Sequence, residues 1–312
     1  MRNSALLKSA SLQGCMMELV EDAIIIAAGK GRRMLPANLI TPKEFLPLID
    51  LPAIMHLLWE AKLAGVTKVH LVLSQEKKNL FSLAMESNIK LLEEKPRVDF
   101  SEEYLDLRVE GLEIITHVQK NQNGVAGAIL AALNSVRGAF LVMLGDSVMV
   151  DSDSSNTITS SKMGSLASLE LVKKFNQTGV ANAGYVVVSE DQVSNYGVVC
   201  LEGDKIESIV EKPEFGQIAS NMVLCGRYIM PKEFSKIYEN VEDPIFEDQR
   251  MISILNYLIN NGGLRGVNLD KFQFYDCGNP IIWLKSQVDH ALRRSDYKDD
   301  FTEWIKNRIS EA

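Results

Sequence analysis

A glycine-rich segment that carries several cations, Ala28–Arg33, holds the residue types best suited to binding phosphate. Glycines that follow a strand leave successive backbone N–H groups uncovered, so the oxygens of a polyphosphate can approach closely. Lys30, Arg32 and Arg33 add positive charge there, and Lys43 follows shortly after. The segment therefore predicts a loop that binds the phosphates of a ligand. The alternative from these residues alone is a surface turn with solvated charges.

Two common phosphate-binding loops do not fit this segment. A dinucleotide-binding fingerprint needs a third glycine at the position of Met34. A P-loop needs Ser or Thr directly after its Gly-Lys pair, and Gly31 follows Lys30 instead. The chain also has no Ser/His/Asp or Cys/His motif, and its four histidines are expected in the core or at the surface.

Two aspartates stand beside apolar segments. Asp146 follows Leu144-Gly145, and Asp276 precedes Cys277-Gly278-Asn279. Mg²⁺ prefers a few carboxylates together with substrate oxygens, so two distant aspartates suffice if the fold brings them together. From their spacing alone, one helix N-cap and one turn aspartate are the favoured interpretation.

The composition narrows the class of protein. The chain of 312 residues is 46% hydrophobic and 24% charged, as expected for a globular enzyme. Its net charge of -8 argues against a nucleic-acid or anionic-membrane partner. The four scattered cysteines favour a reducing, cytoplasmic compartment. No apolar run reaches the length of a membrane span.

Strands and helices alternate over the first half of the chain. The expected strands are residues 22–28, 66–73, 112–118 and 139–144, and the expected helices are 52–64 and 126–133. This alternation predicts a doubly wound sheet that is mostly parallel, with ligands at the carboxyl ends of its strands. Polar residues follow three of these strands, from Gly29, Gln119 and Asp146.

The second half predicts a mixed extension of the same sheet. Its expected strands are residues 180–188, 196–201, 206–210 and 222–230, with a tight turn at Glu202-Gly203-Asp204. Its expected helices are residues 231–238, 249–259, 280–292 and 301–309. We therefore expect one Rossmann-like α/β domain with a substrate-binding lobe, rather than two independent domains.

The order and spacing of these motifs closely resemble bacterial UTP–glucose-1-phosphate uridylyltransferases, within the sugar-1-phosphate nucleotidyltransferase family. The resemblance covers roughly residues 20 to 310. Its motifs are Gly29-x-Gly31-x-Arg33-Met34-Leu35-Pro36-Ala37, Pro42-Lys43-Glu44-x-Leu46-Pro47-Leu48-x-Asp50-x-Pro52, Gln119 with Gly124 and Ala128, Gly145-Asp146, Tyr196-Gly197-Val198-Val199, Glu211-Lys212-Pro213, Ser220-Asn221, Gly226-Arg227-Tyr228, Gln249, Asp276-Cys277-Gly278-Asn279 and Phe301-x-x-Trp304-Ile305.

The resemblance implies transfer of a uridylyl group from UTP to glucose 1-phosphate, with pyrophosphate as the second product. On the nucleotide side, it implies that backbone groups of Ala28 and Gly29 contact the nucleoside and that Gly31 lets the loop wrap the phosphates. Arg33 and Lys43 would hold the β- and γ-phosphates.

The same resemblance assigns the metal, base and sugar residues. Asp146 and Asp276 would ligate one Mg²⁺. Gln119 would pair with the uracil edge, and Gly124 would give the base room and a backbone contact. On the sugar side, Glu211 would bind glucose hydroxyls, and Lys212 would bind the sugar phosphate and act in catalysis. Gly197 and Gly226, with their neighbours, would line the hexose pocket through backbone contacts.

The resemblance also suggests how the chain is divided. We expect a poorly ordered extension at 1–19 and a nucleotidyltransferase domain at 20–295, made of a nucleotide-binding part (20–150) and a sugar-binding part (151–295). A C-terminal helix, 296–312, would contact another subunit of a homodimer or homotetramer.

Three positions depart from the family pattern: Arg32 replaces a usual threonine, Gly127 a frequent histidine and Ile252 a usual aspartate. Two rival interpretations remain open at this point. One is a glucose-1-phosphate thymidylyltransferase, because uracil and thymine share the edge that Gln119 would bind. The other is a weakly active regulatory paralogue that binds nucleotide or a partner enzyme.

Overall fold

The computed structural model of the chain describes residues 19–94, 106–152, 164–214, 219–241 and 249–311. The extension predicted at the N-terminus lies, apart from Leu19, outside the described residues. The predicted site residues all lie within them.

A parallel block of four strands forms one half of the central sheet. Its spatial order is β5 (Glu113–Val118), β4 (Lys68–Leu73), β1 (Asp22–Ile26) and β6 (Phe140–Leu144). Strand β1 is a short apolar run that is buried along most of its length, as expected for a central parallel strand covered on both faces.

The sheet continues beyond β6 into a mixed part, so that nine strands form one sheet. The additional strands are, in spatial order, β11 (Met222–Met230), β8 (Asn182–Val187), β12 (Arg265–Asn268), β10 (Lys205–Glu211) and β9 (Gly197–Glu202). Strand β11 pairs antiparallel with both neighbours, whereas β12 pairs parallel with β8. The predicted mixed extension of the first sheet is confirmed.

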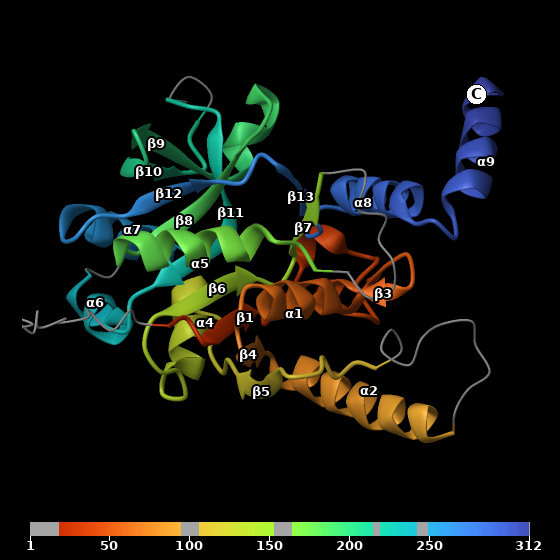
Figure 1. Cartoon of the computed structure of the whole chain (residues 1–312), viewed down its shortest axis with the longest axis horizontal. Coiled ribbons are helices and arrows are strands. Elements are labelled where there is room, and N and C mark those ends of the chain that lie inside the picture. The colour runs from red at the N-terminus through yellow and green to blue at the C-terminus, as the bar shows by residue number, and fades with distance from the viewer. Residues whose placement is uncertain (1–18, 95–105, 153–163, 215–218, 242–248, 312) are drawn as a thin grey trace, which may run out of the picture.

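Helices cover both faces of the sheet, so the predicted doubly wound architecture is confirmed (Figure 1). One apolar cluster joins the sheet to α1 (Ala53–Leu63), α2 (Gln75–Glu93) and α5 (Ala167–Thr178). A second cluster, on the opposite face, involves α4 (Gly124–Leu133), α6 (Phe234–Asn240) and α7 (Arg250–Asn260). Successive β1 residues illustrate the division, because Ile24 belongs to the second cluster and Ile25 to the first.

Two small ribbons lie outside the main sheet. Strand β7 (Ser147–Asp151) pairs antiparallel with β13 (Phe272–Asp276), and β2 (Pro47–Leu48) pairs with β3 (Leu51–Pro52). The 3₁₀ helices are η1 (Arg32–Met34), η2 (Lys43–Phe45) and η3 (Glu190–Asn195).

The last two helices extend away from the sheet. Helix α8 (Pro280–Arg293) packs on β13, and α9 (Lys298–Ser310) contacts α8 and projects from the rest of the molecule (Figure 1). No residue of α9 is buried, and Trp304 on this helix is 57% exposed.

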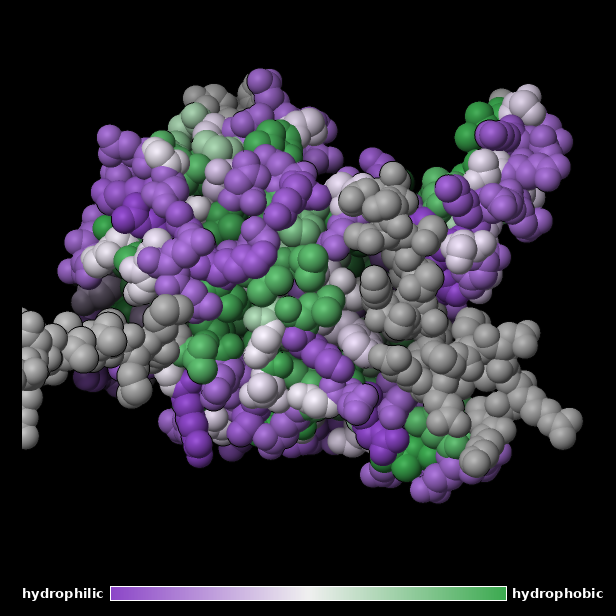
Figure 2. Space-filling model, viewed as in Figure 1, coloured by the Kyte–Doolittle hydropathy of each residue, from purple (hydrophilic) through white to green (hydrophobic). Residues whose placement is uncertain are grey.

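The view in Figure 2 shows a largely hydrophilic surface, with hydrophobic residues gathered near its middle, between α5 and α1. Within the described residues, no helix is long and apolar enough to cross a membrane.

Candidate active site

The glycine-rich loop leaves the carboxyl end of β1 and needs glycine at one position in particular. Gly31 has φ +62°, in the left-handed region. A Cβ there would lie 2.5 Å from Nδ2 of Asn38, and that same Nδ2 donates hydrogen bonds to the carbonyls of Gly31 at 2.9 Å and Lys30 at 3.2 Å. A larger residue at 31 would therefore displace the side chain that holds the loop.

A buried lysine that the sequence analysis missed, Lys77 on α2, anchors the same loop. Its Nζ donates to the carbonyls of Ala27 and Gly29, both at 2.7 Å, and to Oε2 of Glu44 at 2.6 Å. All three ammonium hydrogens can thus be used within the protein. Burial lowers the pKa of Lys77 and raises the pKa of Glu44, and the contact between them opposes both shifts.

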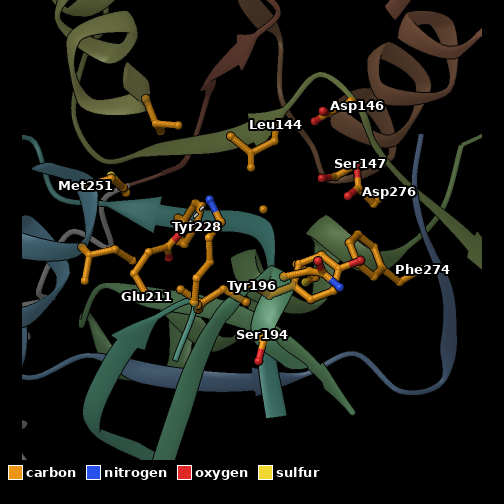
Figure 3. Close-up of a pocket in the computed structure, with 18 of the residues that line it drawn as sticks. Leu144, Asp146, Ser147, Ser194, Tyr196, Glu211, Tyr228, Met251, Phe274 and Asp276 are labelled. Carbon is orange, nitrogen blue, oxygen red and sulfur yellow. Dashed lines mark ion pairs between the residues drawn. The ribbon is translucent and has the colours of Figure 1, made fainter. Parts of the chain in front are cut away.

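The ribbon formed by β7 and β13 brings the two predicted metal ligands together. Asp146 directly precedes β7, and Asp276 ends β13, opposite Ser147. The close approach is visible at Gly278, where a Cβ would lie 2.6 Å from Oδ2 of Asp146 and 2.9 Å from Oδ1 of Asp276. Both carboxylates therefore surround one point, at one end of the pocket in Figure 3.

Two predicted phosphate ligands neutralise these carboxylates. Nη1 and Nη2 of Arg33 donate to Oδ2 and Oδ1 of Asp276 at 3.1 and 3.3 Å. The Nζ of Lys43 forms an ion pair with Asp146. The two acids and two cations therefore form one charged cluster beside the glycine-rich loop. Arg33 reaches the aspartates from η1, and Lys43 reaches them from η2.

The cluster shifts the pKa values of its members in different directions. Burial and the nearby charge of Asp146 raise the pKa of Asp276. Burial would also raise the pKa of Asp146, but the charge and hydrogen bond of Lys43 outweigh it and lower that pKa. Burial opposes the charged form of Lys43, yet the charges of Asp146 and Glu44 raise its pKa.

The donor set of this cluster fits a hard divalent cation. Two facing carboxylates suit Mg²⁺, which takes one or two protein carboxylates and completes its shell with water and substrate oxygens. The described residues include no group of three or more His, Cys, Asp or Glu side chains placed to hold a metal. Water and substrate oxygens would supply the remaining ligands.

A cavity of about 420 Å³ extends from the aspartates toward β9, β10 and α7 (Figure 3). Its lining includes both predicted metal ligands, Arg33 and the predicted sugar-side residues. These residues are Arg33, Asp146, Gly197, Glu211, Lys212, Gly226 and Asp276. Lining residues not singled out from the sequence include Val125, Ser194, Met251 and Phe274. The sequence contained no motif signal for these four positions.

The sugar-side pair lies at the end of β10. Glu211 is in register with Gly197 on β9, and a Cβ at Gly197 would lie 3.0 Å from Oε2 of Glu211. Lys212 forms an ion pair with Glu211 at 3.3 Å and has φ +43°, which is unusual for a residue with a side chain. Backbone strain of this kind often accompanies a functional position.

The neighbouring residues Gly226 and Arg227 have different roles. Gly226 lines the cavity with φ +74°, whereas the Arg227 side chain is fully buried. Nε and Nη2 of Arg227 donate to the carboxylate of Glu60 at 2.8 and 2.9 Å, and Nη2 also donates to the carbonyl of Ser147 at 2.6 Å. Arg227 therefore ties β11 to α1 and to the backbone beside Asp146.

The predicted base-binding residues lie outside the lining of this cavity, next to the glycine-rich loop. Gln119 directly follows β5, and its Nε2 donates to the carbonyl of Gly124 at 3.0 Å. Gly124 has φ +76°. Nε2 of Gln122 reaches the carbonyl of Ala28 at 3.5 Å, so the two loops are connected.

The three departures from the family pattern fall in different environments. Arg32 is exposed, Ile252 lines the cavity, and Gly127 is buried in α4 against the side chain of Asn123. The thiols of Cys200, Cys225 and Cys277 are free.

Comparison with known proteins is consistent with this arrangement. The model of the nucleotidyl transferase family matches residues 22–287. The chain is 28% identical over 297 residues to the UTP–glucose-1-phosphate uridylyltransferase of Haemophilus influenzae, covering 91% of this chain and 98% of that protein. It is 29% identical over 301 residues to UTP–glucose-1-phosphate uridylyltransferase 2 of Streptococcus pyogenes serotype M3, covering 93% and 96%.

Solved structures show the same fold. The UTP-bound UGPase from Acinetobacter baumannii superposes with a TM-score of 0.77 at 25% identity, covering 92% of this chain and 99% of that one.

Proposed function

The chain belongs to the nucleotidyl transferase family, and from this premise we propose that it transfers a uridylyl group from UTP to glucose 1-phosphate. The products are UDP-glucose and pyrophosphate. The observation that carries the proposal is the meeting of Asp146 and Asp276 with Arg33 and Lys43 between the glycine-rich loop and the cavity. The curated relatives named above support the choice of UTP and glucose 1-phosphate.

The reaction joins two anions without a protein nucleophile. An oxygen of the sugar phosphate forms a bond to the α-phosphorus of UTP, and the bond from that phosphorus to the β-phosphate oxygen breaks. Pyrophosphate leaves with the electron pair. A phosphate monoester has a second pKa near ~6, so it is already largely dianionic at neutral pH and needs no general base. The protein must align the reactants and neutralise charge.

Asp146 and Asp276 would hold the Mg²⁺ ion, because they supply two hard carboxylates at one point. When bound, Mg²⁺ would supply positive charge that reduces the mutual repulsion of the two substrate phosphates. Arg33 and Lys43 form ion pairs with these carboxylates in the structure. We propose that both side chains turn to the β- and γ-phosphates when the substrate and metal bind.

The sugar phosphate would occupy the cavity. Glu211 would accept hydrogen bonds from hexose hydroxyls, and Lys212 would bind the sugar phosphate and balance its charge during attack. The absence of a Cβ at Gly197 and Gly226 leaves backbone groups beside the hexose.

The nucleotide would lie along the loops outside that cavity. Backbone groups of Ala28 and Gly29 would contact the nucleoside, and Gly31 would let the loop follow the phosphates. Gln119 and Gly124 would contact the base.

Three further features of the protein belong to this proposal. The enzyme acts in the cytoplasm as a homodimer or homotetramer, with the exposed helix α9 as the candidate subunit contact. Residues 20–150 form the nucleotide-binding part, and residues 151–295 form the sugar-binding part. Its ligands are small molecules rather than nucleic acids or membranes.

A substrate panel tests the proposal. Pyrophosphate release should be measured for UTP, dTTP, CTP, ATP and GTP, each with several sugar 1-phosphates, with and without Mg²⁺. The proposal expects the greatest turnover with UTP and glucose 1-phosphate, and only when Mg²⁺ is present. A higher kcat/KM with dTTP would identify a thymidylyltransferase instead. No release from any pair would favour a regulatory nucleotide-binding protein.

A further inference from the structure

The amide group of Gln119 has a fixed orientation in the structure. Its Nε2 donates one hydrogen bond to Oδ1 of Asn123 at 2.9 Å and another to the carbonyl of Gly124 at 3.0 Å. A side-chain amide has two N–H hydrogens, so both are used within the protein. What Gln119 can offer a ligand is its carbonyl oxygen, which is an acceptor.

Asn123 can hold this position only because residue 127 is glycine. A Cβ at Gly127 would lie 1.8 Å from Oδ1 of Asn123 and 2.1 Å from its Cγ. Any side chain at 127 would therefore force Asn123 away from Gln119. Gly127 lies inside α4, where alanine would be the better helix former by about 1 kcal/mol. Glycine at position 127 thus leaves the space that Asn123 needs to accept a hydrogen bond from Gln119.

We propose that Asn123, packed on Gly127, is a positioning residue that presents the Gln119 carbonyl to the nucleobase and thereby selects uracil over cytosine. This inference rests on the proposed function, in which Gln119 contacts the base. Uracil carries an N–H at N3, which can donate to a carbonyl oxygen. Cytosine has a lone pair at N3, so a fixed carbonyl would face a second acceptor.

The alternative orientation of the amide explains why a fixed partner matters. Rotation of the Gln119 amide by half a turn exchanges its oxygen and nitrogen, and the rotated group would donate to N3 of cytosine. Asn123 and the Gly124 carbonyl both oppose this rotation, because each accepts from Nε2 and would face an oxygen instead. Without Asn123, only the Gly124 carbonyl still holds Nε2, so the rotated amide that suits cytosine costs less free energy.

Nucleotide binding to the full chain tests the inference without requiring turnover. Dissociation constants for UTP and CTP, each with Mg²⁺, should be measured by calorimetry for the wild type, Asn123→Ala and Gly127→Ala. The wild type should bind UTP more tightly, and both variants should reduce the UTP preference by about tenfold, the order of one hydrogen-bond contribution. The double variant should match the single variants, because all remove the same contact.

Asn121→Ala provides the matched control, because Asn121 is exposed in the same loop and its side chain takes no part in the hydrogen bonds of the Gln119 amide. Its UTP preference should equal that of the wild type. If Asn123→Ala fails to fold, Gly127→Ala still tests the inference. Alanine favours the helix, so this variant is expected to fold.

An unchanged UTP-to-CTP ratio in a folded Asn123→Ala or Gly127→Ala would overturn the inference, as would a wild type that binds both equally. A general loss of stability would weaken the binding of both nucleotides equally and leave the ratio of their dissociation constants unchanged. Failure of the wild type to release pyrophosphate would instead count against the proposed function, and the binding ratio would still report on Asn123.

Discussion

The backbone N–H of Cys277 donates a hydrogen bond of 2.8 Å to the carbonyl oxygen of Asp146. This bond extends the ladder between β7 and β13 by one step, so the aspartate before one strand lies beside the aspartate that ends the other. Two carboxylates far apart in the sequence thus face one point through a local backbone pairing.

Replacing Arg33 should reduce turnover more than substrate affinity. The negative charge on departing pyrophosphate grows in the transition state, so a cation that stabilises it contributes mainly to kcat. We expect kcat of Arg33→Ala to fall by a factor on the order of 10² to 10³, with a much smaller change in KM for UTP. Steady-state kinetics of Arg33→Ala and Arg33→Lys measure this, and unchanged turnover in Arg33→Ala would contradict the assigned role.

Lys77→Met should destabilise the protein and loosen the glycine-rich loop. The change removes the donor for the carbonyls of Ala27 and Gly29 and leaves Glu44 buried without its cation. Breaking a buried pair in this way costs roughly 3–5 kcal/mol of unfolding free energy. Urea denaturation of Lys77→Met and of the neighbouring Lys78→Met provides the comparison. Equal stability of the two variants would show that Lys77 does not anchor the loop.

The buried pair of Arg227 and Glu60 should show strong coupling. Arg227→Met alone leaves the Glu60 carboxylate uncompensated, so we expect a loss of roughly 3–5 kcal/mol in unfolding free energy. Adding Glu60→Leu should recover much of this loss, because no buried charge then remains. A double-mutant cycle by denaturant unfolding measures the coupling. Additive effects of the two changes would argue against a shared interaction.

The regular elements were predicted well where their signal is local. Strand β11 appears over the predicted residues, 222–230, because apolar residues and Gly226 surround a single charged residue, Arg227, in an almost wholly buried run. Helix α2 was missed because its buried face includes Lys77, which breaks the apolar period. The β7–β13 ribbon was missed because both strands are short and pair across more than a hundred residues, for which no local pattern exists.

The candidate site was predicted mainly through the resemblance to a family. Spacing alone favoured an N-cap and a turn role for Asp146 and Asp276, and the structure places both at one cavity. The ion pairs of Arg33 and Lys43 with these acids could not be predicted, because side-chain contacts between distant segments depend on the tertiary fold. The Asn123 contact with Gln119 depends on which side chain fills the space above Gly127.

Stability should fall on mild acidification through His290. Burial lowers the pKa of His290 below its ordinary value of 6.5, so the folded protein keeps this ring neutral while the unfolded chain takes up a proton. Unfolding therefore becomes more favourable as pH falls below about 6.5, by up to about 1.4 kcal/mol per pH unit from this group. Thermal midpoints between pH 7 and 5.5 should show a shallower slope for His290→Phe. An identical slope would exclude His290 as a contributor.

Metal binding by the two aspartates is the central claim, and Mn²⁺ affinity in the presence of UTP tests it most directly. Electron paramagnetic resonance of free Mn²⁺ should be recorded for the wild type, Asp146→Asn, Asp276→Asn and the control Asp299→Asn on the exposed helix α9. Each of the first two variants removes one carboxylate ligand, so both should weaken Mn²⁺ binding by at least about tenfold and reduce Mg²⁺-dependent pyrophosphate release. Asp299→Asn should behave as the wild type. Wild-type Mn²⁺ affinity in both Asp146→Asn and Asp276→Asn would contradict the account.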